Sequence, residues 1–171
     1  MDRISYDFNK RSAKGSGWIF ILCTVIVGFM LIAIPLPSWA SIWRPAWIAL
    51  LIFYWGITSP EKVGVIFSFC TGLFLDVYHG GTLGEHALAL SVVSLVAITY
   101  SKRFRLYPSL QQSLFVGLVL LVYVVSIRKI QNFDAPLING FDPFSEAISS
   151  ALLWPWFALI LNDLARRFTL R

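Results

Sequence analysis

The residues with the most chemical potential lie in one stretch, residues 63–87. Gly64, Ser68, Gly72 and Asp76 recur every fourth residue, so small side chains form a slowly drifting stripe along one helix. Such spacing favours close helix packing, either within the protein or against a partner helix. The carboxylate that ends the stripe is costly in lipid, which makes Asp76 a functional hypothesis. Asp76 either hydrogen-bonds the following turn and fixes its geometry, or pairs with a cation or polar group on a neighbouring helix or partner protein.

A glycine-rich turn follows Asp76, with His79, Glu85 and His86 around it. Imidazole and carboxylate groups are competent metal ligands. Two of these three residues are adjacent, however, and no further ligand-rich motif supports them, so we predict neither a metal site nor a cofactor. The sequence also lacks a phosphate-binding glycine loop and the HExxH and GxSxG motifs. We therefore assign no catalytic residue and expect a protein that is not an enzyme.

The elements that must position these residues are membrane helices. Of the 171 residues, 57% are hydrophobic and only 13% are charged, which is the composition of a multi-spanning membrane protein. The net charge of +5 lies in the chain ends and short connectors. Basic residues beside apolar spans set topology and attract anionic lipids, so we predict membrane lipids as partners and no nucleic acid.

Six apolar runs predict an all-α, polytopic fold with six transmembrane helices, at residues 18–34, 46–57, 63–77, 87–100, 114–127 and 148–161. The second run is short, because its length corresponds to about 18 Å of helix against roughly 30 Å of hydrocarbon. It either crosses with the help of its Trp-rich flanks or lies partly re-entrant. Pro155 predicts a kink in the last helix. Residues 18–161 then form one transmembrane domain, between basic tails at 1–17 and 162–171.

The fourteen Lys and Arg residues predict how these spans are oriented. With six spans and a cytoplasmic amino terminus, eleven of them lie inside and three outside. If residues 46–57 did not cross, six would lie inside and eight outside. The positive-inside rule therefore favours six spans with both termini in the cytoplasm, and it places Asp76 and its turn toward the outer surface.

The order and spacing of several motifs resemble the rod shape-determining MreD family over nearly the whole chain. These motifs are Arg44-Pro45-x-Trp47 leading to Tyr54-Trp55, then Gly72-x-x-x-Asp76, then Gly80-Gly81-Thr82-Leu83-Gly84, and finally Leu153-Trp154-Pro155-Trp156. The resemblance transfers structural or partner-interaction roles only to matching positions. Together with Gly64 and Ser68 of the stripe, the candidate positions are Arg44, Pro45, Trp47, Tyr54, Trp55, Gly72, Asp76, Gly84, Trp154 and Pro155.

The resemblance implies a multi-pass component of the bacterial inner membrane that acts in the cell-elongation (rod) complex. It implies a helical layout similar to the substrate-binding subunits of energy-coupling-factor vitamin transporters. The implied partners are MreC and, through it, MreB, RodA and a class B penicillin-binding transpeptidase. Two functions follow as hypotheses. One is a scaffold that holds peptidoglycan synthases together through helix–helix contacts. The other is a transporter-like binder of a lipid or small molecule in a cavity between the helices, with Asp76 and its loop at the mouth.

Overall fold

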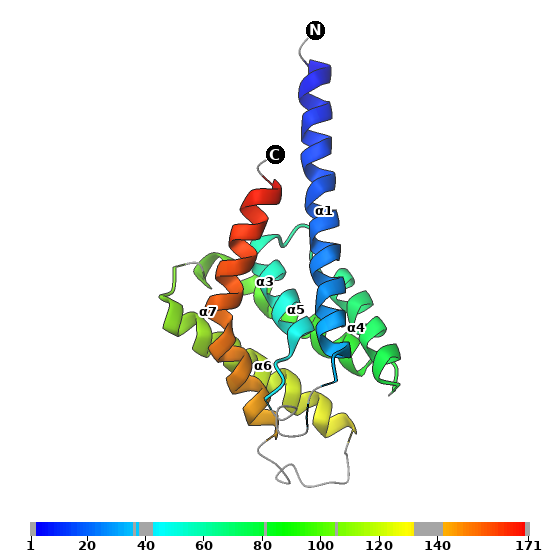
Figure 1. Ribbon diagram of the computed structural model, residues 1–171, viewed down its shortest axis with the longest axis vertical. Helices are drawn as coiled ribbons and strands as arrows, with labels where there is room; N and C mark the ends of the chain where they lie inside the picture. The colour runs from blue at the N-terminus through cyan, green and yellow to red at the C-terminus, as the bar shows by residue number, and fades with distance from the viewer. Residues whose placement is uncertain are drawn as a thin grey trace.

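A computed structural model describes residues 3–35, 37, 43–80, 82–104, 106–131 and 142–169, and this part of the chain forms helices without strands. The helices are α1 (Arg3–Ala33), α3 (Trp47–Thr58), α4 (Val65–His79), α5 (Glu85–Phe104), α6 (Ser109–Gln131) and α7 (Asp142–Thr169). In Figure 1 the amino-terminal part of α1 extends well beyond the other helices. The carboxyl-terminal end of α7 lies at the same end of the molecule as the start of α1.

The short helix α3 is the centre of the bundle. Every residue from Ile48 to Ile57 is buried, and α1, α5, α6 and α7 all contact this helix. A helix that is apolar on all sides suits either a protein interior or lipid, and α3 lies in the protein interior. Phe53 packs edge-on against Phe104 and Trp154, with ring centroids 5.5 Å apart in both pairs. The second apolar run is therefore the helix around which the others pack.

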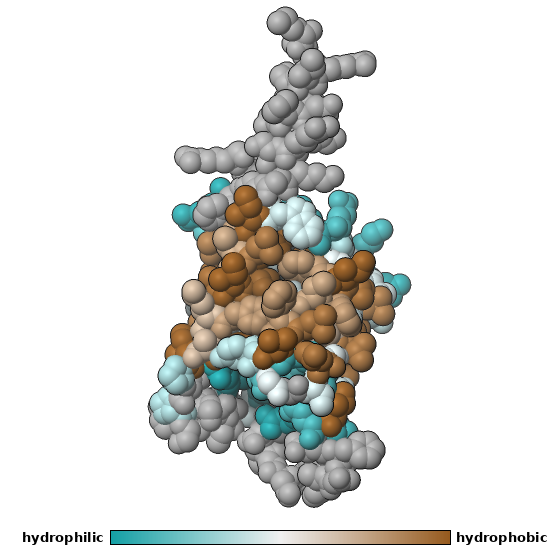
Figure 2. Space-filling model, turned by 90° about the vertical axis from the view of Figure 1, so that its right-hand side faces the viewer, coloured by the Kyte–Doolittle hydropathy of each residue, from teal (hydrophilic) through white to brown (hydrophobic). Residues whose placement is uncertain are grey.

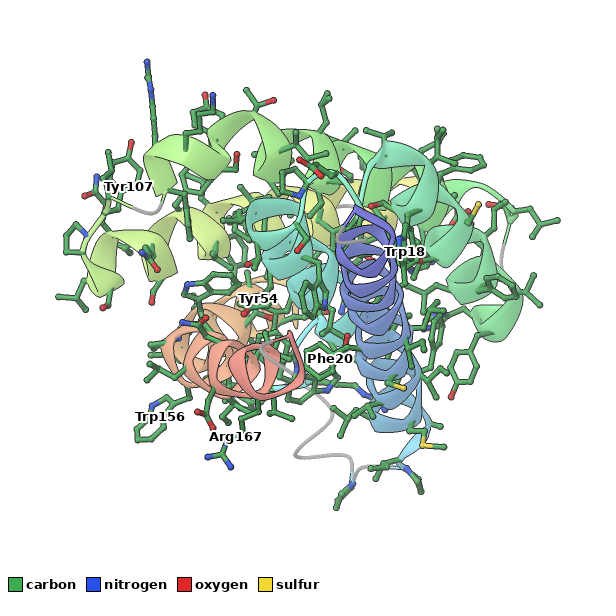
Figure 3. All side chains as sticks on the ribbon, turned by 90° about the horizontal axis from the view of Figure 1, so that it is seen from above. Trp18, Phe20, Tyr54, Tyr107, Trp156 and Arg167 are labelled. Atoms are coloured by element: carbon green, nitrogen blue, oxygen red, sulfur yellow. The ribbon has the colours of Figure 1, made fainter. Side chains whose placement is uncertain are left out.

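Two tryptophans correct a general expectation about this residue type. Tryptophans in such a sequence are expected mainly at the membrane interface. Trp55 and Trp154 are instead buried inside the bundle, and the indole Nε1 of Trp55 donates a hydrogen bond to Thr24 Oγ1 at 3.0 Å. Trp156 and Trp43 remain exposed. Seen from above in Figure 3, Trp156 points away from the bundle, whereas Tyr54 lies inside it.

The outer surface of the bundle is apolar. Large hydrophobic side chains are exposed on α1, α4, α5, α6 and α7. On the face shown in Figure 2, hydrophobic residues form a brown band across the middle, with hydrophilic residues gathered at both ends. Three helical segments are long and apolar enough to cross a membrane, at Glu85–Phe104, Ser109–Gln131 and Phe144–Ala165. Shorter apolar helices occupy Gly17–Ala33, Trp47–Thr58 and Val65–His79.

The helices extend beyond the apolar runs that predicted them. The first run begins at residue 18, but α1 begins at Arg3, and α7 extends past its run at both ends. Hydropathy marks only the part of a helix that suits lipid, whereas Lys, Arg and Glu are good helix formers that continue it into water. Helix α7 also continues through Pro155. Six membrane crossings and the likeness to vitamin-transporter subunits remain predictions.

Candidate functional site

The carboxylate of Asp76 lies at the start of α5 and takes the place of a capping residue there. Its Oδ2 accepts hydrogen bonds from the backbone N–H groups of Gly84 (2.8 Å) and Ala87 (3.3 Å). Its Oδ1 accepts from the backbone N–H (2.8 Å) and the imidazole Nδ1 (2.8 Å) of His86. The first N–H groups of a helix have no partner within the helix and carry partial positive charge, so an anion stabilises them.

The turn between the two helices brings this carboxylate into position. Helix α4 ends at His79, and Gly80 follows with φ +67° as a left-handed C-cap. Gly84 has φ +109°, a conformation that other residues rarely adopt, and α5 begins directly after it. The Thr82 hydroxyl also donates to the Glu85 carboxylate. The glycines that sequence analysis placed in a turn thus reverse the chain so that the last turn of α4 meets the first turn of α5.

The small-residue stripe on α4 packs against α5. A Cβ atom at Gly72 would lie 2.6 Å from Ala87 N and 2.7 Å from His86 O, so only glycine fits there. Ser68 is fully buried, and its hydroxyl donates to Gly64 O at 3.1 Å. Gly64 itself has open space around it. Of the two uses foreseen for the stripe, close packing within the protein accounts for Ser68, Gly72 and Asp76.

Two histidines lie beside Asp76 with their rings stacked. The centroids of His79 and His86 are 5.0 Å apart and the rings are inclined by 6°. His79 Nδ1 donates to Leu75 O at 3.0 Å, and His86 Nδ1 donates to Asp76 Oδ1. Each ring therefore uses Nδ1 in a hydrogen bond within the protein, and its other nitrogen, Nε2, is the acceptor in the neutral imidazole. Among the residues that the structure describes, no three His, Cys, Asp or Glu side chains are grouped as metal ligands.

Arg44 joins the end of α1 to the start of α3. One terminal nitrogen of its guanidinium, Nη2, donates to the carbonyl oxygens of Leu31 (3.3 Å) and Ile34 (3.1 Å) and also to that of Ile32. A basic side chain on the last carbonyls of a helix complements the helix dipole. Nearby, the backbone N–H of Ala46 donates to Ser150 Oγ of α7 at 3.1 Å. The Arg44-Pro45-x-Trp47 motif thus holds α1, α3 and α7 together at one end of the bundle.

Arg44, Pro45, Trp47, His79 and His86 line one cavity of about 390 Å³. This volume lies within the usual range for small-ligand sites. The opposite wall comes from α6 and α7, where Arg128 Nη2 lies 3.6 Å from Glu146 Oε2.

Sequence analysis missed three residues of that wall, Tyr123, Arg128 and Glu146. Arg128 was considered only as a topology signal. Its position next to an apolar run and 18 residues before Glu146 in the sequence is compatible with a pairing but does not predict it.

The motif residues Tyr54, Trp154 and Pro155 do not join this site. Tyr54 and Trp154 line a second cavity of about 320 Å³ at the other end of α3, together with Thr58, Gln112 and Asn162. The indole Nε1 of Trp154 is buried and has no hydrogen-bond partner among the described residues. The two ends of the bundle therefore carry separate groups of the candidate positions.

The fold and the site together define a class. The chain is a polytopic helical membrane protein whose polar residues cap helices and line cavities. Within the described residues they form no metal-ligand group.

The sequence profile of the family described as "rod shape-determining protein MreD" matches residues 13–164. The curated "Rod shape-determining protein MreD" of Haemophilus influenzae (strain ATCC 51907 / DSM 11121 / KW20 / Rd) is 34% identical over 159 residues, covering 90% of this chain and 94% of that protein. No solved structure gives a significant match. The chain belongs to the MreD family, which is named for its role in cell shape rather than for a reaction.

Proposed function

We propose that this protein is a six-span component of the bacterial inner membrane that scaffolds peptidoglycan synthesis in the cell-elongation complex. Its direct partner is MreC, and through MreC it joins MreB, RodA and a class B penicillin-binding transpeptidase. Membership of the MreD family supports the role in cell shape. Both termini lie in the cytoplasm in this proposal, with residues 1–17 and 162–171 as basic tails on either side of the transmembrane domain.

Three observations support six spans. The described chain has six apolar helical segments, three of them long and three shorter. The described ends of α1 and α7 lie at the same end of the bundle, as an even number of crossings requires (Figure 1). Eleven of the fourteen Lys and Arg residues then lie on the cytoplasmic side.

The structural observation that supports a scaffolding role is an open apolar groove between α1 and α7. The groove has a volume of about 490 Å³, and its lining includes Val27, Leu31, Phe157 and Ile160. In membranes, helices associate through van der Waals packing, and an apolar groove between two helices accepts a third helix. The small-residue stripe on α4 is covered by α5, so the groove is the better candidate for the partner helix.

Co-purification with MreC from co-expressing membranes tests this proposal. Val27→Trp fills the groove, and Ile26→Trp is the matched control, because Ile26 lies outside the groove lining and the two side chains are 54% and 55% exposed. We expect Val27→Trp to lower the recovered MreC about fivefold or more, the effect of losing about 1 kcal/mol of binding. Ile26→Trp should leave it unchanged. Equal recovery with both variants and the wild type would rule out the groove as the contact.

A second candidate function is the binding of a lipid or small molecule between the helices. The observation that favours it is the 390 Å³ cavity, whose lining includes charged, histidine and aromatic side chains as well as apolar ones. Retention of a lipid or ligand by the purified protein, measured by native mass spectrometry, tests this function.

A further inference from the structure

An open apolar groove runs between α5 and α6 on the outside of the bundle. It has a volume of about 450 Å³ and is separate from the groove between α1 and α7. Leu88 of α5 and Leu118 of α6 belong to its lining, and both side chains are 63% exposed. The groove is therefore open to whatever surrounds the apolar face of the protein.

Short side chains on α5 create this groove. The middle of its α5 wall consists mainly of alanine and valine, at Ala89, Val92, Val93 and Val96. Aromatic rings join the two helices at both ends of this stretch. At one end the ring centroids of Tyr100 and Phe115 are 5.3 Å apart, and at the other those of His86 and Tyr123 are 6.4 Å apart. The helices thus touch at the ends of the groove and leave it open between them.

The length of the groove favours a lipid chain over a helix as its occupant. Glu85 and Tyr100 mark its ends on α5, about 22 Å apart at 1.5 Å per residue. One acyl chain of a phospholipid covers about half of the roughly 30 Å hydrocarbon core, so it ends within the groove. A transmembrane helix of about 20 residues would instead continue past the aromatic contacts at both ends.

The charges at the two ends of the groove differ. Glu85 is the only charged residue in the described lining, and it lies at the end next to the α4–α5 turn. Arg103 follows Val92 by 11 residues and Val96 by 7, about three and two helical turns, so it continues the groove face at the other end. Arg103 and the neighbouring Lys102 are exposed, and within the described chain neither side chain forms an ion pair or a hydrogen bond.

We propose that this groove binds an acyl chain of an anionic phospholipid whose phosphate contacts Arg103 and Lys102. A guanidinium group pairs well with phosphate, and basic residues at the membrane surface attract anionic headgroups. The carboxylate of Glu85 repels such a headgroup, so the lipid lies with its phosphate at the Arg103 end. Under the topology proposed above this end faces the cytoplasm, and only the choice of the cytoplasmic leaflet rests on the proposed function.

Native mass spectrometry of the full-length protein with phosphatidylglycerol and phosphatidylethanolamine of equal acyl chains tests the headgroup contact. We expect the wild type to prefer the anionic phosphatidylglycerol. Arg103→Gln should lower the affinity for phosphatidylglycerol about fivefold, the contribution of one basic residue beside an anionic surface, and leave that for phosphatidylethanolamine nearly unchanged. Arg167→Gln is the control, because Arg167 is exposed and lies outside the groove lining, and it should keep the preference.

A second pair of variants tests the chain in the groove. Val92→Trp fills the groove and should lower the retention of both lipids about fivefold, which corresponds to about 1 kcal/mol. Leu95→Trp is the matched control, because Leu95 lies on the same helix outside the lining and both side chains are 56% exposed. It should leave the retention of both lipids unchanged.

The other occupants of the groove give different results. Equal lipid retention by Val92→Trp and the wild type would overturn the groove as the site of the chain. A phosphatidylglycerol preference that survives in Arg103→Gln would overturn the headgroup contact. Loss of a dimer from the same spectra, or of MreC from the co-purification, in Val92→Trp with unchanged lipid retention would assign the groove to a second copy or to the partner helix. Val27→Trp tests the proposed function at the other groove, so the two proposals can fail separately.

Discussion

Replacing Asp76 by Asn should destabilise the protein by removing the cap of α5. The substitution keeps the size of the side chain but exchanges one carboxylate oxygen for an NH₂ group, which donates instead of accepting. In the native protein each oxygen accepts two hydrogen bonds, from Gly84 and Ala87 on Oδ2 and from the backbone and ring of His86 on Oδ1. If the NH₂ group faces Gly84 and Ala87, both backbone N–H groups lose their acceptor. If it faces His86, the backbone N–H of His86 loses its acceptor, while the ring can change tautomer and accept from the amide.

The magnitude follows from burial and charge. Asp76 is 1% exposed, so water does not replace the lost acceptor. Leaving a buried donor unsatisfied costs about 1–3 kcal/mol, so one or two of them cost about 1–6 kcal/mol before relaxation. The remaining hydrogen bonds also lose the strength that a charged acceptor gives them. We expect a loss of about 3 kcal/mol for Asp76→Asn and a larger loss for Asp76→Ala, which leaves all four donors without an acceptor.

Two measurements check this prediction. Unfolding in mixed micelles gives the stability, and amide hydrogen exchange reports on the backbone N–H groups of Gly84, His86 and Ala87, which should exchange faster in the variant. Asp163→Asn is the matched control. Its carboxylate is 62% exposed and pairs with Arg167 on the surface of α7, where an ion pair contributes about 0–1 kcal/mol. Stability within about 0.5 kcal/mol of the wild type, with unchanged exchange at α5, would refute the capping argument.

The other contacts give three further predictions. Gly72→Leu should lower the free energy of unfolding by more than about 2 kcal/mol in the same assay, because the larger side chain clashes with α5. Gly64→Leu is the control, and it should change the free energy of unfolding by less than about 0.5 kcal/mol because Gly64 has open space around it. Similar losses for the two variants would contradict the close packing at Gly72. Trp55→Phe removes the indole hydrogen bond to α1 and should cost about 1 kcal/mol, and no loss would mean that this bond is not formed. Phe53→Ala should lower the free energy of unfolding by about 3–5 kcal/mol, because the ring is fully buried. Phe74→Ala, at a side chain that is 71% exposed, should lower it by less than about 1 kcal/mol. A small loss for Phe53→Ala would show that α3 is not the core.

The helices were predictable because lipid imposes a strong pattern on sequence. Long uncharged runs such as residues 114–127 leave little alternative to a helix, since the backbone must satisfy its own hydrogen bonds. The close packing of the stripe was also predictable, because Gly72 lies at a helical interval from other small residues. The turn at Gly84 was predictable as well, since a glycine between two helices indicates a backbone conformation that other residues rarely adopt.

The polar contacts between distant segments were not predictable. Arg44 caps the end of α1 although it lies just before α3 in the sequence, and Ser150 of α7 accepts from Ala46 at the start of α3, more than 100 residues earlier. Such pairs depend on the packing of helices in three dimensions, which periodicity along one helix does not encode. The burial of Trp55 and Trp154 has the same origin. Hydropathy describes how well a helix suits an apolar environment, but lipid and protein interior are equally apolar, so it does not separate them.

The position of α3 between two cavities has an electrical consequence. The cavity beside Arg44 reaches the first residues of α3, and the cavity beside Trp154 reaches its last ones. When water enters both, the membrane voltage falls across the middle of α3 between Ala49 and Tyr54 rather than across the full bilayer, over about 8 Å at 1.5 Å per residue. The field there is about four times that in the surrounding lipid, because the same voltage acts over roughly a quarter of the 30 Å hydrocarbon thickness. The buried ring of Phe53 lies in this stretch, so its bulk is part of what separates the two cavities.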